Sequence, residues 1–266
     1  MTRKLGRYLT LLVHQVRASV LLSAQYRADF LIDGAIEVLW ATNAVVPLLI
    51  VYGQRSSIAG WTFGEALLVT AFFTLLQGVL EGAINPSLTA VVEHVRKGTL
   101  DFVLLKPADA QFLISTARFQ PWRAINVVTA GILFVIAFRN IGELPSLRGV
   151  LLALGLVVGS VTTLYSLWIL TVSAAFYVVK VDNLTYLFGS IFDAARWPAS
   201  VFKGALRILL TIVIPLAAMT TYPAEALLGR VSPTSAAVAV ITPVVIATAA
   251  RLIWVRSLSR YTSASG

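Results

Sequence analysis

Six long apolar stretches, separated by polar or basic segments, dominate this chain of 266 residues. Hydrophobic residues make up 58% of the sequence and charged residues only 12%, whereas a soluble globular domain carries about 25% charged residues. Because a soluble surface has to be covered by polar groups, this deficit predicts that lipid is the main solvent. A span needs about 20 apolar residues to cross about 30 Å of hydrocarbon. We therefore predict an all-α integral membrane protein with six transmembrane helices. The predicted spans are residues 30–52, 65–84, 124–138, 150–179, 208–219 and 236–255.

The third and fifth predicted spans are short. The fifth is followed by Tyr222-Pro223 and by a further apolar turn at 224–228. Irregular backbone at membrane depth is tolerated only where it is buried in protein or lines a water-filled cavity. The arrangement therefore predicts a short re-entrant helix after the fifth span, which dips into the membrane from outside.

The segment before the first span has the pattern of an amphipathic helix. Its apolar residues recur at helical spacing, while its basic side chains lie largely off that stripe. Interruptions at His14, Gln15 and Arg17 leave no continuous apolar core of the kind that a signal peptide has. Residues 1–28 are therefore predicted to form an interfacial helix on the cytoplasmic face, with a helix packed on protein as the alternative. The stripe consists of Leu5, Tyr8, Leu9, Leu12, Val16 and Val20.

The distribution of Lys and Arg predicts the orientation. Of the 21 basic residues, 17 lie in the N-terminal segment, in the loops after the second and fourth spans, and in the tail, and 4 lie elsewhere. Cytoplasmic loops carry an excess of Lys and Arg, so both termini are predicted to be cytoplasmic.

The loop after the fourth span is expected to hold a second interfacial helix, because its apolar residues also recur at helical spacing. We find no internal repeat and no low-complexity linker. A single transmembrane domain over 1–266 is therefore predicted, with the interfacial helix at 1–28, the bundle at 29–256 and a tail at 257–266. The apolar face of the second interfacial helix consists of Leu184, Leu187, Phe188, Ile191, Phe192 and Ala195.

The sequence shows no constellation of catalytic residues. It has no cysteine, which excludes disulfides and thiolate metal sites, and His14 and His94 have no companions at ligand spacing. A phosphate-binding loop is absent: the Gly-rich run 155–160 has no lysine and suits close helix packing instead. The net charge of +9 lies at span ends, where topology and anionic lipid account for it without nucleic acid. We therefore predict that the chain is not itself an enzyme and holds no cofactor.

Three carboxylates lie within the apolar stretches, at Asp33, Glu37 and Glu81. Carboxylates in a membrane are costly to bury, so they are functional candidates by default. Asp33 and Glu37 are i, i+4 neighbours near the inner start of the first span, where pairing with Arg27 is the alternative. Glu81 lies near the inner end of the second span, where structural pairing at headgroup depth is again the alternative.

The loop after the second span carries the most specific pattern, within residues 91–107. A charged helix end is followed by Gly98, which is expected to form the C-cap. Thr99 is then expected to cap a short helix that has Asp101 in its first turn and ends at Pro107. Such a rigid helix between two spans is suited to transmitting a push from a soluble partner, although a helix lying on the lipid surface fits the pattern equally well.

This loop resembles that of a known family. The run RKGTLDFVLLKP, residues 96–107, is similar to the R-x-G-T-L-[DE]-x-L-L-x-x-P loop of ABC-2 type transporter permeases. The six-span order, the amphipathic N-terminal helix and the inside termini resemble the same family. The segment 177–184 and Ile214-Pro215, followed by Tyr222-Pro223-Ala224, resemble a bacterial branch of paired permeases.

The resemblance implies the permease half of an ABC exporter in a bacterial plasma membrane. Two permease subunits, identical or paralogous, would pair with two cytoplasmic ATPase subunits that hold ATP and Mg. The N-terminal helix would also contact the ATPase, and an extracellular gate region would include Tyr222, Pro223 and Glu225. The implied ATPase-coupling loop comprises Glu93, Arg96, Lys97, Gly98, Thr99, Leu100, Asp101, Leu104, Lys106 and Pro107.

The sequence predicts an amphipathic, lipid-like or drug-like substrate and does not identify it more closely. Aromatic residues such as Trp40, Phe72, Phe73 and Trp168 fit either an aromatic-cation pathway or anchors that face lipid. The rival hypothesis is a proton-coupled secondary carrier or channel that uses the three intramembrane carboxylates, and it requires no ATPase.

Overall fold

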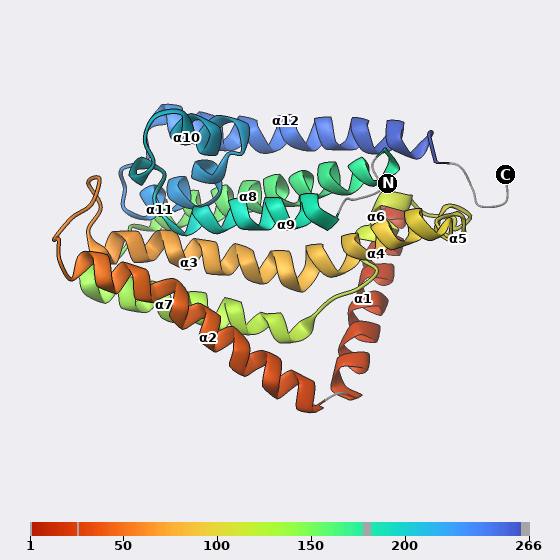
Figure 1. Ribbon diagram of the computed structural model, residues 1–266, viewed down its shortest axis with the longest axis horizontal. Helices are drawn as coiled ribbons and strands as arrows, with labels where there is room; N and C mark the ends of the chain where they lie inside the picture. The colour runs from red at the N-terminus through yellow and green to blue at the C-terminus, as the bar shows by residue number, and fades with distance from the viewer. Residues whose placement is uncertain (1, 26, 178–181, 262–266) are drawn as a thin grey trace.

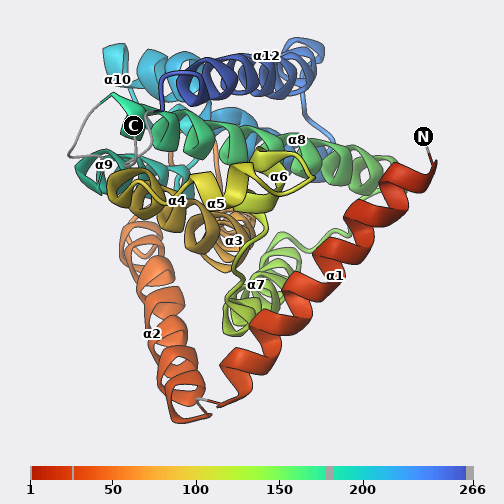
Figure 2. The ribbon, with the colours of Figure 1, turned by 90° about the vertical axis from the view of Figure 1, so that its right-hand side faces the viewer.

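The computed structural model describes residues 2–25, 27–177 and 182–261, and these residues are helical with short connections. The longer helices run side by side along the long axis of the molecule, while α1 crosses one end of the bundle (Figures 1 and 2). The helices are α1 Thr2–Gln25, α2 Arg27–Tyr52, α3 Phe63–Val79, α4 Asn85–Lys97, α5 Asp101–Leu104, α6 Ala110–Ser115, α7 Ile125–Ile141, α8 Leu147–Ser173, α9 Asp182–Phe192, α10 Gly204–Ile208, α11 Tyr222–Leu227 and α12 Pro233–Leu258.

The two ends of the bundle differ, and we name them the α5 end and the α11 end. The α5 end carries α1, α4, α5 and α6 (Figure 1). Both described chain ends lie there, because Arg7 donates to the carbonyl of Pro107 and Leu100 N–H donates to the Tyr261 hydroxyl at 3.2 Å. The α11 end carries α11 and the loop between α2 and α3 (Figure 1).

Four helical segments are long and apolar enough to cross a membrane: Phe63–Lys97, Pro121–Ile141, Leu147–Phe176 and Pro233–Leu258. A fifth is counted if Gly204–Ile212 and Ala217–Leu227, which are bent by 65° relative to each other, form one span. The prediction of an all-helical multi-pass membrane protein is therefore confirmed, with four to five candidate spans among the described residues. The second predicted span is longer than expected, since its helix continues to Lys97.

The predicted fifth span, 208–219, is not a continuous helix, and this expectation was wrong. Ile214 adopts an extended conformation (φ −116°, ψ 95°) between the π-helical turns Leu209–Val213 and Ala217–Thr221. Pro215 explains the break, because its ring disfavours the helical conformation of the residue before it. The expected short helix after this segment is present as α11.

The segment after α8 also differs from the prediction. Helix α9 lies lengthwise beside α3 and α8 rather than across the end of the bundle (Figures 1 and 2). Phe188, Ile191 and Phe192 of the predicted apolar face pack on protein, whereas Leu187 is 53% exposed. The Phe192 ring lies 5.2 Å from that of Phe73 and 6.5 Å from that of Trp168. The chain then continues towards the α11 end, where Trp61 Nε1–H donates to Ser200 Oγ at 3.0 Å.

Close helix packing at small residues holds α8 and α12 together. A Cβ added at Gly159 of α8 would lie 3.1 Å from Pro243 Cγ and 3.2 Å from the Ala239 carbonyl oxygen of α12. The packing role predicted for the Gly-rich run 155–160 therefore falls on Gly159, while Gly155 faces open space. Without such a side chain the two helices approach closely along their length.

Candidate functional site

Glu81 lies where the long helix formed by α3 and α4 changes its winding. Residues Leu80–Ile84 form a π-helical turn, η1, between the two helices. Pro86 has no N–H to donate to the Gly82 carbonyl, and the N–H of Gln120 donates to that carbonyl instead, at 2.8 Å. The Gly82 carbonyl therefore keeps a hydrogen-bond partner in the irregular turn. Single π-helical turns inside helices are frequent at functional sites.

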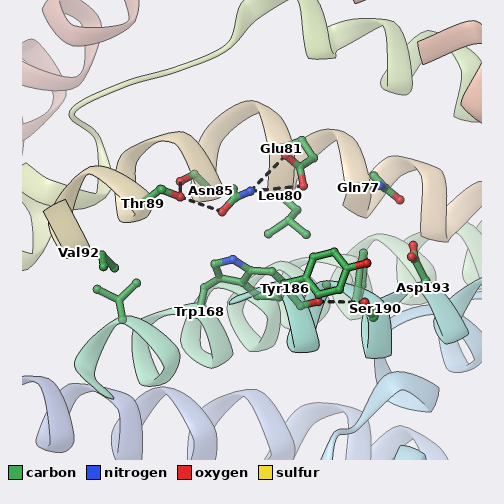
Figure 3. A pocket seen from close by; sticks show the side chains of 13 residues that line it. Gln77, Leu80, Glu81, Asn85, Thr89, Val92, Trp168, Tyr186, Ser190 and Asp193 are labelled. Carbon is green, nitrogen blue, oxygen red and sulfur yellow. Dashed lines mark hydrogen bonds between the residues drawn. The ribbon is translucent and has the colours of Figure 1, made fainter. Parts of the chain in front are cut away.

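Glu81 lines three neighbouring cavities of about 510, 390 and 570 Å³. The first lies between the α3–α4 helix, α8 and α9 (Figure 3). The second lies beside Trp40 of α2 and Phe73 of α3, and the third beside Ser19 of α1. Among the intramembrane carboxylates predicted from the sequence, Glu81 thus has a defined position, whereas the side chains of Asp33 and Glu37 lie outside the described residues.

The polar partners of Glu81 come from its own helix and from the segment after α9. Asn85 Nδ2 donates to the two carboxylate oxygens of Glu81 at 3.3 and 3.5 Å. Asp193 lines the first two cavities together with Glu81 and forms an ion pair with Arg196 at 3.0 Å. The Arg196 guanidinium lies 5.2 Å from the centre of the Phe73 ring. Asp193 and Arg196 had been predicted to lie in a cytoplasmic loop, so the sequence did not identify them as neighbours of Glu81.

The aromatic residues proposed for a pathway fall into two groups. Phe72, Phe73 and Trp168 are buried in the core, so they do not face lipid as anchors would. Trp40 is 64% exposed and borders the second cavity. Of these four residues, Trp40, Phe73 and Trp168 line cavities that Glu81 also lines.

The short helix α5 forms a projecting corner at the α5 end. Gly98 ends α4 in the left-handed conformation (φ 65°), as predicted. The predicted cap at Thr99 was wrong, because its hydroxyl is bonded to His94 Nδ1 at 2.8 Å and Leu100 is the N-cap residue of α5. Phe102 and Leu105 are 70% and 81% exposed at the tip. Nothing in the local residue pattern distinguishes these two exposed apolar residues from the buried Leu100.

Of the other residues predicted for the coupling loop, one is buried in the core and several are exposed. Leu100 is fully buried, and Glu93 and Lys97 form an exposed ion pair at 2.6 Å. Leu104 is 37% exposed, and Lys106 and Pro107 follow it on the surface. The loop therefore has a buried base and an exposed tip.

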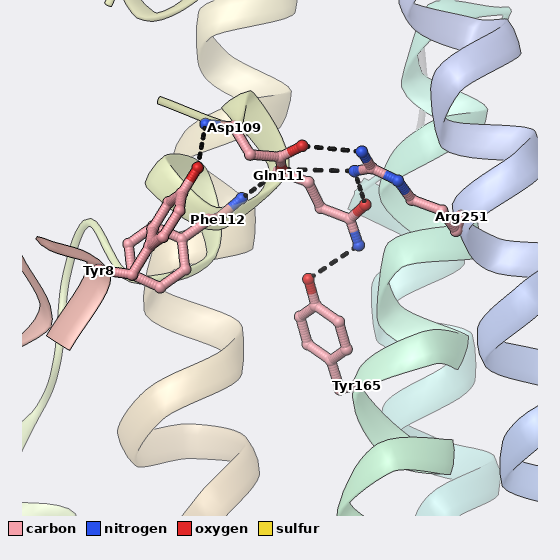
Figure 4. Close-up of polar contacts among 6 residues, drawn as sticks. All are labelled: Tyr8, Asp109, Gln111, Phe112, Tyr165 and Arg251. Carbon is pink, nitrogen blue, oxygen red and sulfur yellow. Dashed lines mark hydrogen bonds and ion pairs between the residues drawn. The ribbon is translucent and has the colours of Figure 1, made fainter. Parts of the chain in front are cut away.

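A hydrogen-bonded network, the Asp109 network, joins the segment after α5 to three long helices (Figure 4). Asp109 begins α6 and forms an ion pair at 2.7 Å with Arg251 of α12, which also donates to Gln111 at 2.6 Å. Gln111 donates to the hydroxyl of Tyr165 in α8 at 3.0 Å, and Asp109 N–H donates to the hydroxyl of Tyr8 in α1 at 3.1 Å. The network comprises Tyr8, Asp109, Gln111, Tyr165 and Arg251.

The charge state of Asp109 is fixed by this network. Partial burial raises the pKa of Asp109, but hydrogen bonds from the Arg251 guanidinium and from the Phe112 N–H outweigh burial and hold the pKa below its ordinary value. The side chain also accepts from Phe112 N–H as the N-cap of α6, at 3.1 Å. Asp109 is therefore a charged anchor at neutral pH.

The α11 end is held by a second set of polar contacts. Arg230, in the connection between α11 and α12, forms an ion pair with Glu65 of α3 at 2.8 Å, and its guanidinium lies 4.5 Å from the centre of the Trp61 ring. Pro223 is buried beside α8, and Tyr222 and Glu225 are only partly exposed. The Glu65–Arg230 pair was not predicted, because its two residues are 165 positions apart.

These features define a class of protein: a multi-pass helical membrane protein with polar cavities inside the bundle. Among the residues that the structure describes, no three His, Asp or Glu side chains gather to hold a metal ion. The family model described as "ABC-2 family transporter protein" matches residues 38–265, and the chain belongs to this family. It is thus a membrane permease component of an ABC transporter rather than a catalytic subunit, and ABC permeases generally pair with ATPase subunits. No curated protein and no solved structure matches the chain significantly.

Proposed function

We propose that the chain is the transmembrane subunit of an ATP-driven exporter that moves an amphipathic, lipid-like or drug-like substrate out of a bacterial cell through its plasma membrane. It assembles with a second permease subunit, identical or paralogous, and with two cytoplasmic ATPase subunits that supply ATP and Mg. Family membership supports the ATP-driven class over the proton-coupled carrier or channel, which would rely on Asp33, Glu37 and Glu81.

The proposed topology has six spans in a single domain of residues 1–266, with both termini and the α5 end in the cytoplasm. In this topology α2, α3–α4, α7, α8 and α12 cross the membrane, and the segment 182–201, which begins with α9, makes the sixth crossing in place of the predicted span 208–219. The bent segment 204–227 enters from outside, and α11 at its end is proposed as the predicted re-entrant helix. In this topology Arg196, Lys203 and Arg207 are no longer counted on the cytoplasmic side. Of the 21 basic residues, 14 then lie on the cytoplasmic side and 7 on the other side, compared with 17 and 4 in the prediction from the sequence. The excess of positive charge still favours a cytoplasmic α5 end.

The observation that carries the proposal is the exposed tip of α5. Phe102 and Leu105 are strongly exposed at the end of a helix pair that begins in the core of the bundle. Exposed apolar side chains on a rigid corner are suited to a partner groove. Closure of the ATPase subunits on ATP would then move α5, and the Asp109 network would carry this movement to α1, α8 and α12. A partner shifts such an equilibrium only through its differential affinity for the two states.

The test places a charge on this tip. Leu105→Asp and Phe102→Asp should each prevent co-purification of the ATPase subunits and abolish ATP-dependent transport in membrane vesicles. Leu144→Asp is the matched control, because Leu144 is 88% exposed in the loop between α7 and α8 at the opposite end. The proposal fails if the α5 variants keep the ATPase bound and transport intact, or if transport is lost with a protonophore while ATP is still present.

A further inference from the structure

The first cavity has the lining of a ligand site. It holds about 510 Å³, within the range of small-molecule pockets, and lies between the α3–α4 helix, α8 and α9. Figure 3 shows Glu81 and Asn85 on one side, with Trp168 and Tyr186 facing them from the other. Gln77 and Asp193 complete the polar part of the lining. The walls thus combine carboxylates, amides and aromatic rings.

The charge inside this cavity is negative. Glu81 and Asp193 are the charged side chains among the described residues that line it. Asp193 is paired with Arg196, whereas Glu81 receives only the neutral amide of Asn85 and takes no part in the ion pairs of the described residues. A carboxylate away from water is stabilised by a neighbouring cation and destabilised by a second carboxylate. The cavity therefore favours a positively charged occupant.

A second and independent observation is an unused hydrogen-bond donor. Trp168 is only 3% exposed, and its Nε1–H finds no acceptor among the described residues. In Figure 3 the indole nitrogen faces the open space below Asn85 and Leu80. A buried donor without an acceptor is unfavourable, so an occupant with an acceptor at this position would be stabilised.

The aromatic walls fit the same kind of occupant. Trp168, Tyr186 and Phe192 line the cavity, and the faces of such rings attract organic cations. An anion would be repelled by the carboxylates, and a neutral molecule would leave Glu81 without a counter-charge. A metal ion does not fit, because the cavity is wide and offers only two carboxylates.

We infer that this cavity binds an organic cation, an amine or quaternary nitrogen carried on an apolar body, with a hydrogen-bond acceptor placed against Trp168. The cationic group lies beside Glu81, and the apolar body lies against the rings of Trp168 and Tyr186. This inference rests on the proposed transport function and names the substrate class. Glu81 lies in the π-helical turn that connects α3 to α4, and the cavity is lined by α4 residues up to Val92, so the occupied cavity adjoins the helix that leads to α5.

The test is a binding measurement on the full chain in nanodiscs of neutral lipid, with and without its ATPase subunits. The probe is rhodamine 6G, a fluorescent cation that carries ester and ether oxygens, and fluorescein methyl ester is the anionic dye of similar shape. Fluorescence polarisation should show saturable binding of rhodamine 6G and none of the anion. Glu81→Gln should weaken binding about tenfold, the effect of losing one favourable charge contact.

Two further variants keep the test decisive. Asp193→Asn should also weaken binding, and Trp168→Phe, which keeps an aromatic ring but removes the donor, should weaken it a few-fold. Glu143→Gln is the matched control, since Glu143 is an exposed carboxylate in the loop between α7 and α8, and it should bind as the unaltered chain does. Circular dichroism and gel filtration check that each variant is folded.

The outcomes separate the two proposals. Equal binding of both dyes, or unchanged rhodamine 6G affinity in folded Glu81→Gln and Asp193→Asn, would overturn the cation site. If the ATPase subunits do not bind the chain but the charge-dependent affinity persists, the exporter proposal fails and the cation site stands. If the ATPase binds and rhodamine 6G does not, the site fails and the exporter proposal stands.

Discussion

The two ends of the bundle are each held by an ion pair between an arginine and a carboxylate, and the comparison shows how differently they are built. At the α5 end, Arg251 and Asp109 lie 2.7 Å apart inside a network that joins four helices, α1, α6, α8 and α12. At the α11 end, Arg230 and Glu65 lie 2.8 Å apart and join α3 to the connection before α12, and Arg230 also lies over Trp61, whose Nε1–H donates to Ser200. The ion-pair distances are nearly equal, and the difference lies in where the partners are: helices at the α5 end, but mostly connections between helices at the α11 end.

This difference matches the proposed roles of the two ends. A network whose members share partners resists distortion as a unit. The α5 end is thus suited to move as one body when an ATPase pushes on α5. The α11 end, whose contacts run through the connecting residues Trp61, Ser200 and Arg230, is suited to open. Tyr222, Pro223 and Glu225, the proposed extracellular gate region, lie at this second end.

The largest expected effect comes from breaking the network. Arg251→Ala removes the contacts to both Asp109 and Gln111, so it should lower ATP-dependent transport at least about tenfold while ATP hydrolysis continues, because the push is no longer passed to α12. Transport and hydrolysis are measured together in proteoliposomes. Arg256→Ala, an exposed arginine nearly one and a half turns along the same helix, is the control and should leave both unchanged. Equal loss in both variants would contradict the network's role.

A packing change at the α11 end should come next in size. A Cβ at Gly149 of α8 would lie 2.7 Å from the Ala226 carbonyl oxygen of α11, closer than such atoms approach. Gly149→Val should therefore separate α8 from α11 and cost about 1–3 kcal/mol of stability, seen as a lower unfolding temperature in detergent. Gly155→Val on the same helix faces open space and serves as the control. Similar losses in both would show that the contact is unimportant.

The Glu65–Arg230 pair should matter less. Because Arg230 is 39% exposed, its removal in Arg230→Ala should cost about 1 kcal/mol or less. Transport should change by only two- to threefold, with a higher passive leak of substrate if the pair helps to close this end. Differential scanning fluorimetry and a leak assay without ATP measure the two effects. A loss as large as that of Arg251→Ala would remove the contrast between the ends.

The smallest effect concerns pH. The pKa of Asp109 is lower in the folded chain than in the unfolded chain, so its contribution to stability is present above the ordinary aspartate pKa and is lost as the pH falls through the lowered value. The difference in unfolding temperature between the unaltered chain and Asp109→Asn should therefore stay constant from pH 8 to about pH 5 and shrink only below about pH 4. A difference that already disappears near pH 6 would contradict the charged anchor.

Much of the local structure could be predicted from the sequence, because it depends on neighbouring residues. Gly98 as a C-cap and the short helix α11 at Tyr222-Pro223 follow from short-range rules. Glu81 stood out because a carboxylate in an apolar run is rare. The amphipathic face of α9 was also visible, but periodicity reports which face is buried and not what covers it. Here the cover is Phe73 and Trp168 rather than a lipid surface.

The site contacts could not be predicted because they join residues that are distant along the chain. Asp109 and Arg251 are 142 positions apart, and the meeting of Glu81 with Asp193 and Trp168 requires α9 to pack lengthwise beside α3 and α8 (Figure 1). Even the Thr99 cap failed for a physical reason, since His94 competes for the same hydroxyl. A lone arginine in an apolar helix, as at Arg251, was a usable signal that a carboxylate partner had to exist.

The most direct test compares movement at the two ends during the ATP cycle. Because the chain has no cysteine, spin labels can be attached at introduced cysteines without background. One pair, at Lys106 and Arg256, flanks the Asp109 network, and another, at Ser56 and Thr234, flanks the Glu65–Arg230 pair; all four residues are exposed. Between the nucleotide-free complex and the complex trapped with ATP and vanadate, the distance across the α5 end should stay constant and that across the α11 end should increase. A changing distance at the α5 end with a fixed one at the α11 end would contradict the account.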